Sequence, residues 1–228
     1  MKKLFYFFLL AGLIVSCKKQ TDDSSTVDST NNYFPIEIGN TWIYDVDSIG
    51  YDDNSGTTVI DSSHHYQYKE IVTENLIDAE GKPMQKLSRF YRKNDSDTWA
   101  SANNWTISRS NLMAQKVQEN IRYVKLVFPL NSNSSWNGNM FNNTFSNTYF
   151  VEDFDQPATI NGTTYDKTLK VSRNSSVNAI EEIRQFEIYA RNIGLIYFLS
   201  DSINTQPIDS IRTKSRGFRY RLKLKSFQ

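Results

Sequence analysis

Cysteine and histidine are scarce in this sequence, and their scarcity removes several kinds of chemistry. Only Cys17 carries a thiol among 228 residues, which excludes an internal disulfide and a zinc site built from several cysteines. The two histidines are the adjacent pair His64 and His65. Neighbouring residues of a strand face opposite ways, so this pair is poorly placed to hold one metal ion. We therefore expect no metal and no cofactor.

The chain also lacks a strong charge of either sign and a long apolar run. It carries 26 Lys and Arg against 25 Asp and Glu, a formal net charge of +1. Such a balance gives no basic field for a polyanion, so nucleic acid is not expected as a partner. The longest apolar run, 4–15, is shorter than the roughly 20 residues that a bilayer-spanning helix needs.

The N-terminus instead has the pattern of a signal peptide. Lys2 and Lys3 precede the apolar run, which ends in Ile14-Val15-Ser16-Cys17. These four residues resemble the bacterial lipobox. The resemblance implies that residues 1–16 are cleaved and that Cys17 is acylated, with membrane lipid as its partner and palmitate among its acyl chains. Two or more such chains give stable anchoring. An ordinary secretory signal with an incidental Cys17 is the alternative.

Residues 17–32 are expected to be a flexible tether, because they are small and polar and show no apolar periodicity. The segment 18–23 resembles the charged tags that follow the cysteine in surface-exported lipoproteins of the Bacteroidota. The resemblance implies an outer-membrane anchor with the protein displayed on the cell surface. A periplasm-facing anchor in the same membrane is the alternative.

Residues 33–228 are interpreted as one β-rich domain, because aromatic and β-branched residues dominate their periodic stretches. In the clearest stretch, Phe218, Tyr220, Leu222 and Leu224 point one way. Four basic residues point the other way: Arg219, Arg221, Lys223 and Lys225. We interpret this basic row as a solvated outer face rather than a ligand patch. The fold class predicted is all-β and mainly antiparallel, a sandwich or a curved half-barrel with at most one or two short helices.

Turn residues predict two hairpins in the C-terminal half. One turns at Asn161-Gly162, a favoured two-residue turn, and the other joins strands near 183–190 and 195–200. Two segments are ambiguous. Residues 110–120 are compatible with one short helix, and Asn178 and Glu181 have capping-box spacing, although a strand from about residue 182 is favoured.

The segment 131–150 is rich in Asn and Ser with interspersed aromatic residues. It is expected to form a long loop that enters a strand near 144–151. Trp136 and Phe141 are expected to pin this loop to the body of the domain. Long loops in compact domains are often functional, but an ordered surface loop is the plainer interpretation.

The start of the domain, "YFPIEIGNTWIYDV", resembles uncharacterised lipoproteins of the Bacteroidota. The resemblance rests on these residues: Tyr33, Phe34, Pro35, Gly39, Asn40, Trp42 and Tyr44. Shorter likenesses follow at 128–130, 136–139 and 194–197. The resemblance implies an antiparallel β domain on a lipid tether, and it brings no catalytic residue with it.

A second resemblance concerns modification. Four Asp-Ser motifs resemble the O-glycosylation sites of the Bacteroidota and lie in expected loops or strand ends. Their serines are Ser29, Ser48, Ser202 and Ser210. We treat glycans on these four residues as a hypothesis.

Candidate binding residues are Trp99, Trp105 and Trp136, which occur in polar, Asn- and Ser-rich surroundings. Exposed indoles offer flat faces to a glycan or an envelope protein, but each indole could equally cap a small core. Three sets of acidic residues close in sequence are candidates for acid–base catalysis. They are Glu70 with Glu74, Glu152 with Asp153 and Asp155, and Glu181 with Glu182.

The sequence favours a non-enzymatic binding or structural accessory of the cell envelope. Three alternatives stay open. They are a carbohydrate-binding lipoprotein, an acyl-chain carrier whose aromatic residues line a half-barrel, and, least favoured, a glycan-active enzyme.

Overall fold

A computed structural model describes residues 30–52, 59–173, 175–207 and 213–228. A single 3₁₀ helix, η1 (Thr30–Tyr33), precedes the strands. The strands are β1 (Thr41–Asp52), β2 (Val59–Ile77), β3 (Pro83–Arg92), β4 (Ala100–Arg109), β5 (Met113–Gln118), β6 (Ile121–Val127), β7 (Ser135–Asn137), β8 (Thr148–Ile160), β9 (Thr163–Arg173), β10 (Ser176–Val177), β11 (Glu181–Ala190), β12 (Gly194–Pro207) and β13 (Thr213–Phe227). The predicted all-β, antiparallel class is confirmed. No helix among these four ranges has the length and apolarity of a membrane span.

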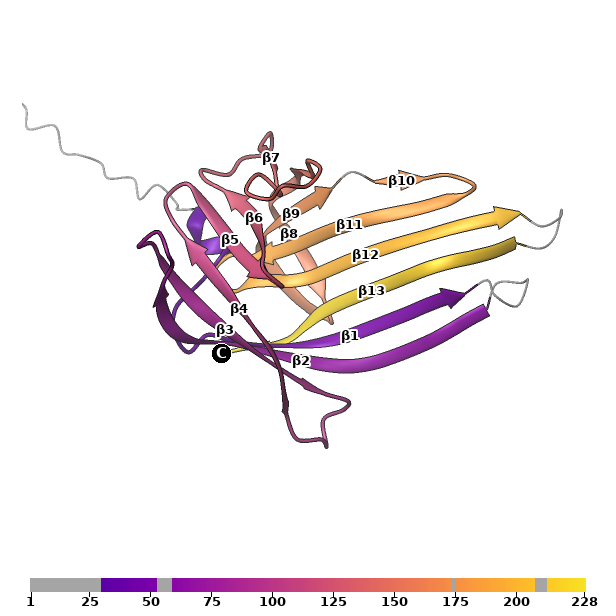
Figure 1. Ribbon diagram of the computed structural model, residues 1–228, viewed down its shortest axis with the longest axis horizontal. Coiled ribbons are helices and arrows are strands. Elements are labelled where there is room, and N and C mark those ends of the chain that lie inside the picture. Colours follow the sequence, from indigo (N-terminus) through magenta and orange to yellow (C-terminus); the bar gives the residue numbers. More distant parts are fainter. Residues whose placement is uncertain (1–29, 53–58, 174, 208–212) are drawn as a thin grey trace, which may run out of the picture.

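The described strands form one 13-stranded sheet in the order β6-β5-β4-β3-β2-β1-β13-β12-β11-β9-β8-β7, with β10 beside β11. Two meanders make it up, a first wing (β1–β6) and a second wing (β7–β13). The wings join where β1 pairs with β13, from Trp42 opposite Phe227 to Tyr51 opposite Gly217. In Figure 1 the long strands of this junction run side by side, while β3 to β6 cross over one end of them.

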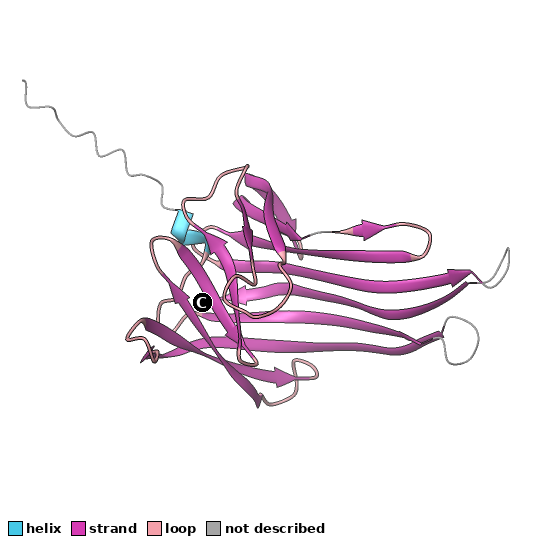
Figure 2. Cartoon of the chain, turned by 45° about the horizontal axis from the view of Figure 1, so that its top comes forward, coloured by secondary structure: helices cyan, strands magenta, loops and turns pink. Residues whose placement is uncertain are grey.

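The sheet curls until its two free edges meet, as twisted antiparallel sheets tend to do. The backbone N–H of Val124 on β6 donates to the carbonyl of Gly138, just after β7, at 2.9 Å. The indole Nε1–H of Trp136 on β7 donates to the carbonyl of Val124 at 3.0 Å. Figure 2 shows the resulting curve. The structure is thus a nearly closed, barrel-like sheet, which matches the predicted curved half-barrel rather than a sandwich, and we keep the name half-barrel for it.

Alternation along the junction strands places apolar side chains inside the curve. Trp42, Tyr44 and Val46 on β1 are buried, and so are Leu222 and Leu224 on β13. This confirms the predicted periodicity of the C-terminal strand. That strand is central, between β1 and β12, so its outward basic row does not protect a sheet edge.

Both predicted hairpins are present. Asn161 and Gly162 have φ of +50° and +78° between β8 and β9, as a type I′ turn requires. The second hairpin joins β11 to β12 and has longer strands than predicted. The strand favoured from residue 182 is confirmed, since β11 begins at Glu181.

The possible helix at 110–120 is wrong, because β5 occupies the middle of that segment. Its apolar spacing is overridden by pairing on both sides, with β4 and with β6. The tight turn to β6 uses Glu119 and Asn120, both with positive φ. Asparagine tolerates that conformation, and this was the overlooked turn signal.

The segment 131–150 contains the short β7 and a series of turns, and β8 starts only at Thr148. Trp136 is buried, as expected of an anchor. Phe141 is not an anchor, because half of its surface is exposed.

Candidate functional site

The concave face of the half-barrel encloses a cavity of about 410 Å³. This volume lies within the range of small-molecule binding sites, roughly 300–1,000 Å³. Its wall is rich in aromatic side chains, which include Trp42, Tyr44, Tyr66, Tyr68, Trp105, Tyr123, Tyr189, Phe198 and Tyr220. Both wings contribute, so the cavity exists only because the sheet curls.

The segment after η1, Phe34-Pro35, closes one end of the cavity, and we call it the plug. Phe34 and Pro35 belong to the cavity wall, and Phe34 is buried. Arg109 fixes this segment by donating to the carbonyls of Asn31 and Phe34, at 3.3 and 2.9 Å. Gly194 has a φ of +91°, and a Cβ there would lie 3.2 Å from the Pro35 ring. A glycine therefore lets the plug sit closely against β12.

The other end of the cavity is lined by half-buried aromatic side chains. Tyr66 on β2 and Tyr220 on β13 lie further along the strands than Trp42, which is beside the plug. Tyr66, Tyr220 and Phe198 are each partly exposed. This end, rather than the plugged one, borders solvent.

The first of two ionic clusters in the wall surrounds Glu70 on β2. Arg89 on β3 donates from Nε to Glu70 Oε1 at 2.8 Å, and Lys116 Nζ lies 3.5 Å from Glu70 Oε2. The guanidinium of Arg89 is stacked between two rings, 4.1 Å from the centroid of Tyr68 and 3.5 Å from that of Trp105. We call these residues the Glu70 cluster.

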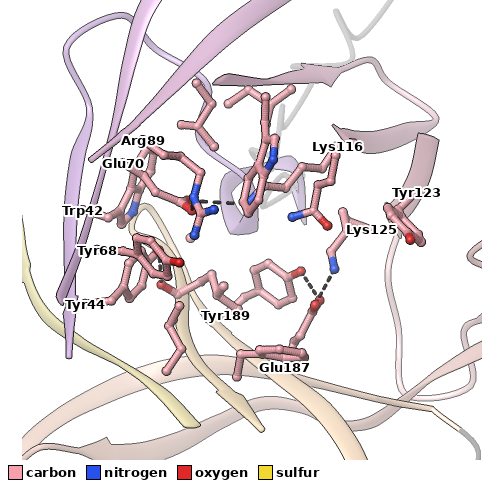
Figure 3. Close-up of a pocket in the computed structure, with 18 of the residues that line it drawn as sticks. Trp42, Tyr44, Tyr68, Glu70, Arg89, Lys116, Tyr123, Lys125, Glu187 and Tyr189 are labelled. Atoms are coloured by element: carbon pink, nitrogen blue, oxygen red, sulfur yellow. Dashed lines mark hydrogen bonds and ion pairs between the residues drawn. The ribbon is translucent and has the colours of Figure 1, made fainter. Parts of the chain in front are cut away.

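The second cluster surrounds Glu187 on β11. Lys125 on β6 and the hydroxyl of Tyr189 both donate to this carboxylate. Arg173 on β9 lies 3.8 Å from the carboxylate and donates to Gln185 at 2.7 Å. Figure 3 shows Lys125 and Tyr189 converging on Glu187, with Glu70 and Arg89 on the other side of the cavity. We call these residues the Glu187 cluster.

Burial acts on every charge in these clusters. It pulls the pKa of Glu70 upward, but the charges of Lys116 and Arg89 outweigh it, so the pKa lies below its usual value. Lys125 and Arg173 have the same effect on the pKa of Glu187. Burial also lowers the pKa of Lys116, and it lowers the pKa of Lys125 to about 8 despite the attraction of Glu187. Both carboxylates are therefore held ionised, whereas both lysines lose part of their preference for the charged state.

The charges of the cavity wall do not balance. Its described cations are Arg89, Lys116, Lys125 and Arg173, and its described carboxylates are Glu70 and Glu187. Four cations against two carboxylates leave two positive charges in excess. Buried charges normally have partners, so this excess is the most informative electrostatic feature of the site.

The three candidate tryptophans do not form one surface. Trp105 lines the cavity, where it contacts Arg89 and Lys116. Trp99 lies away from the cavity, its ring 4.3 Å from the guanidinium of Arg92 and 4.8 Å from Lys69 Nζ. Trp136 is a core residue packed against Tyr149.

The structure places two of the four candidate serines. Ser48 lies inside β1, paired with both β2 and β13, and Ser202 lies inside β12. Both are half-buried strand residues, so the expectation of loops or strand ends is wrong for them. Ser29, Ser210 and the lipidation candidate Cys17 lie outside the described residues.

The predicted carboxylate groups are not brought together in the cavity. Glu70 lies in its wall, but Glu74 is exposed. Glu152 instead pairs with Lys170, Asp155 with Arg191, and Glu182 with Arg219. His64 and His65 are exposed on β2. The described part of the chain has no group of three metal-ligating His, Cys, Asp or Glu residues.

Sequence reasoning missed most of the site, including Arg89, Lys125, Arg173 and Glu187. One signal was available. Lys125 lies between Val124 and Leu126 in β6, and Glu187 lies between Phe186 and Ile188 in β11. A charged residue flanked by apolar residues in a strand is a candidate for a buried ion pair, because charges are rarely buried unpaired.

No protein-family profile matches this chain, and no curated protein sequence matches it. Two solved structures are similar. One is a candidate lipoprotein from Parabacteroides distasonis, 12% identical, with a TM-score of 0.36. The other is a candidate exported protein with a YmcC-like fold from Bacteroides fragilis, 13% identical, with a TM-score of 0.41. Each comparison covers 86% of this chain and 98% of the other chain.

Proposed function

We propose that this protein is a lipoprotein of the outer membrane, anchored through acylated Cys17, that binds a small apolar molecule inside its half-barrel without transforming it. The observation that carries the binding role is the cavity of about 410 Å³ with its aromatic wall. Apolar pockets with a few convergent polar groups are the usual form of small-molecule sites. Of the functions considered from sequence, the carrier with a half-barrel fits this cavity best.

The protonation state of the cavity carboxylates supports binding without catalysis. A glycosidase of the usual two-carboxylate kind needs one carboxyl with a raised pKa as its general acid. The carboxylates of the cavity, Glu70 and Glu187, both have lowered pKa values and are held by cations. Neither is prepared to donate a proton near neutral pH.

A glycan platform is the second candidate, and the positions of the tryptophans weigh against it. Trp99, Trp105 and Trp136 lie respectively away from the cavity, in its wall and in the core. A sugar-binding platform needs indole faces presented together to solvent, and these three side chains do not share a face.

The anchor is tested by feeding cells labelled palmitate and by replacing Cys17 with serine. We expect label on the wild-type chain, none on Cys17→Ser, and release of the variant from the membrane fraction. Surface proteolysis of intact cells then separates an outward-facing from a periplasm-facing anchor. An unlabelled wild-type chain would overturn the anchored part of the proposal.

The binding role is tested with the anchored chain in lipid nanodiscs. Octanol is the uncharged probe, and its free aqueous concentration is measured because it also enters the bilayer. We expect saturable quenching of tryptophan fluorescence that Trp105→Phe reduces, because Trp42 and Trp105 both line the cavity. The variant Leu87→Phe should weaken binding at least fivefold. Leu87 is a buried residue of the cavity wall, so the larger phenylalanine ring would occupy space that the ligand needs. Absence of Trp105-dependent binding would overturn a cavity for apolar molecules.

A further inference from the structure

The charge excess of the cavity narrows the kind of molecule that it holds. We infer that the ligand is an amphiphilic organic carboxylate, whose negative group lies against Lys116 and Lys125 and whose apolar body lies against the aromatic wall. This inference rests on the proposed binding function and specifies its ligand class.

The first argument is the incomplete pairing of Lys116. An ammonium group has three N–H donors. Among the described residues, the polar contact recorded for Lys116 Nζ is Glu70 Oε2 at 3.5 Å, longer than a normal hydrogen bond of 2.7–3.2 Å. Glu70 is already held by Arg89 at 2.8 Å. Lys116 is only 12% exposed and yet lacks a close acceptor of its own.

The second argument is the position of Lys125. Lys116 on β5 pairs with Tyr123 on β6, and Lys125 follows two positions later as the extra residue of a bulge between Val124 and Leu126. Both ammonium groups belong to the cavity wall, and Figure 3 shows both side chains entering it. Their mutual repulsion contributes to the lowered pKa of Lys125. An anion between them would remove this repulsion and supply the missing acceptor.

The third argument is the chemistry of the remaining wall. Tyr44, Leu87, Ile107, Phe198 and Leu222 give one part of it an apolar surface, beside the polar groups of the two clusters. This apolar part would leave the hydroxyl groups of a sugar without partners, which costs free energy. It suits an alkyl or aromatic body. One negative charge attached to an apolar body satisfies both parts of the cavity.

The experiment compares three probes on the anchored chain in nanodiscs, with tryptophan fluorescence as the readout. Octanoate has the charge and the apolar body, octanol has the body alone, and glucuronate has the charge alone. We expect octanoate to bind at least tenfold more tightly than octanol, and glucuronate to bind more weakly than either. Equal affinities for octanoate and octanol would overturn the inference while leaving the proposed function intact. Glucuronate binding as tightly as octanoate would also overturn it, in favour of an acidic glycan.

Variants then locate the charge recognition. Lys116→Met should reduce the octanoate-to-octanol ratio from at least ten to about one, and Lys116→Arg should retain most of it. Octanol binding by Lys116→Met reports whether the cavity is intact. Lys223→Met removes the same charge from the outer face and is the matched control, for which we expect an unchanged ratio.

An unchanged ratio in Lys116→Met would overturn the placement of the carboxylate. Failure of every probe to bind the wild-type chain would refute the proposed function itself. If the lysine variants fail to fold, the wild-type comparison of octanoate with octanol still decides the question.

Discussion

The outer face of β13 and the wall of the cavity each carry four cations, but the two sets differ in their partners. The outer pairs are Arg219 with Glu182, Arg221 with Asp201, Lys223 with Asp47, and Lys225 with Asp95. Each of these four cations thus contacts a different carboxylate, although Arg184 also pairs with Glu182 and Arg92 with Asp95. In the cavity wall, four cations share Glu70 and Glu187.

This difference shows that counting basic residues does not locate an anion site. The basic row of β13 is the most visible charge pattern in the sequence, yet it is neutralised by neighbouring strands. The cavity cations come from four different strands, so no single stretch of the chain contains the set. What distinguishes them is burial combined with too few counter-charges, a property that exists only in the folded state.

The largest expected effect comes from removing a carboxylate from the cavity. Glu187→Gln leaves Lys125 and Arg173 buried without a counter-charge. Breaking a buried ion pair from one side costs about 3–5 kcal/mol. We expect a loss of this size in the free energy of unfolding, measured by urea denaturation at pH 7.

The matched outer substitution is Asp47→Asn. Its carboxylate is 42% exposed and pairs with Lys223 and His65. Solvent screens such pairs, so we expect a loss below about 1 kcal/mol. If both variants changed the free energy of unfolding equally, the contrast between cavity and outer face would be wrong.

The next largest expected effect is a rise in the free energy of unfolding as the pH increases from 8 to 10. The pKa of Lys125 is lowered by burial to about 8, whereas an unfolded lysine titrates at about 10.5. Between these values the unfolded chain binds more protons than the folded chain, so raising the pH favours folding. The expected gain in the free energy of unfolding is about 2 kcal/mol, from 1.36 kcal/mol per unit of pKa difference.

The control for this pH dependence is Lys125→Met, which should lack the part of the rise that Lys125 causes and keep that of Lys116, whose pKa burial also lowers. The window ends near pH 10, because buried tyrosines such as Tyr44 and Tyr189 have raised pKa values and destabilise the fold above it. Denaturation midpoints at pH 7.5, 8.5 and 9.5 measure the effect. A wild-type curve parallel to that of Lys125→Met would show that Lys125 is charged throughout the window.

The parts of the fold that were predictable are those written in local patterns. Alternation in 218–224 identified the inward face of β13, and Asn161-Gly162 identified a hairpin. Local patterns failed where pairing decided the outcome. The segment 112–117 has helical spacing but is held as β5 by strands on both sides.

The candidate site was much less predictable, because it depends on the curl of the whole sheet. Glu70 and Arg89 are neighbours through the β2–β3 hairpin, which a local argument can reach. Lys125 and Glu187 are 62 residues apart and meet across the curve. Of the candidate tryptophans only Trp105 lines the cavity, since which face of β4 turns inward depends on register rather than composition.

The smallest expected effect is that of Lys223→Met. The effect must be small if the outer cations of β13 differ from the buried cations of the cavity wall. Lys223 is 35% exposed, so water can solvate the charges of Lys223 and Asp47 even when the ion pair is absent. We expect a change below about 1 kcal/mol in the free energy of unfolding, because exposed ion pairs are worth little. Octanoate affinity should also stay within twofold of wild type. A clear loss of affinity would mean that the field of the whole protein, rather than the pair of cavity lysines, attracts the anion. Increasing ionic strength separates these cases, because salt screens the distant outer charge much more than a buried ammonium in contact with a carboxylate.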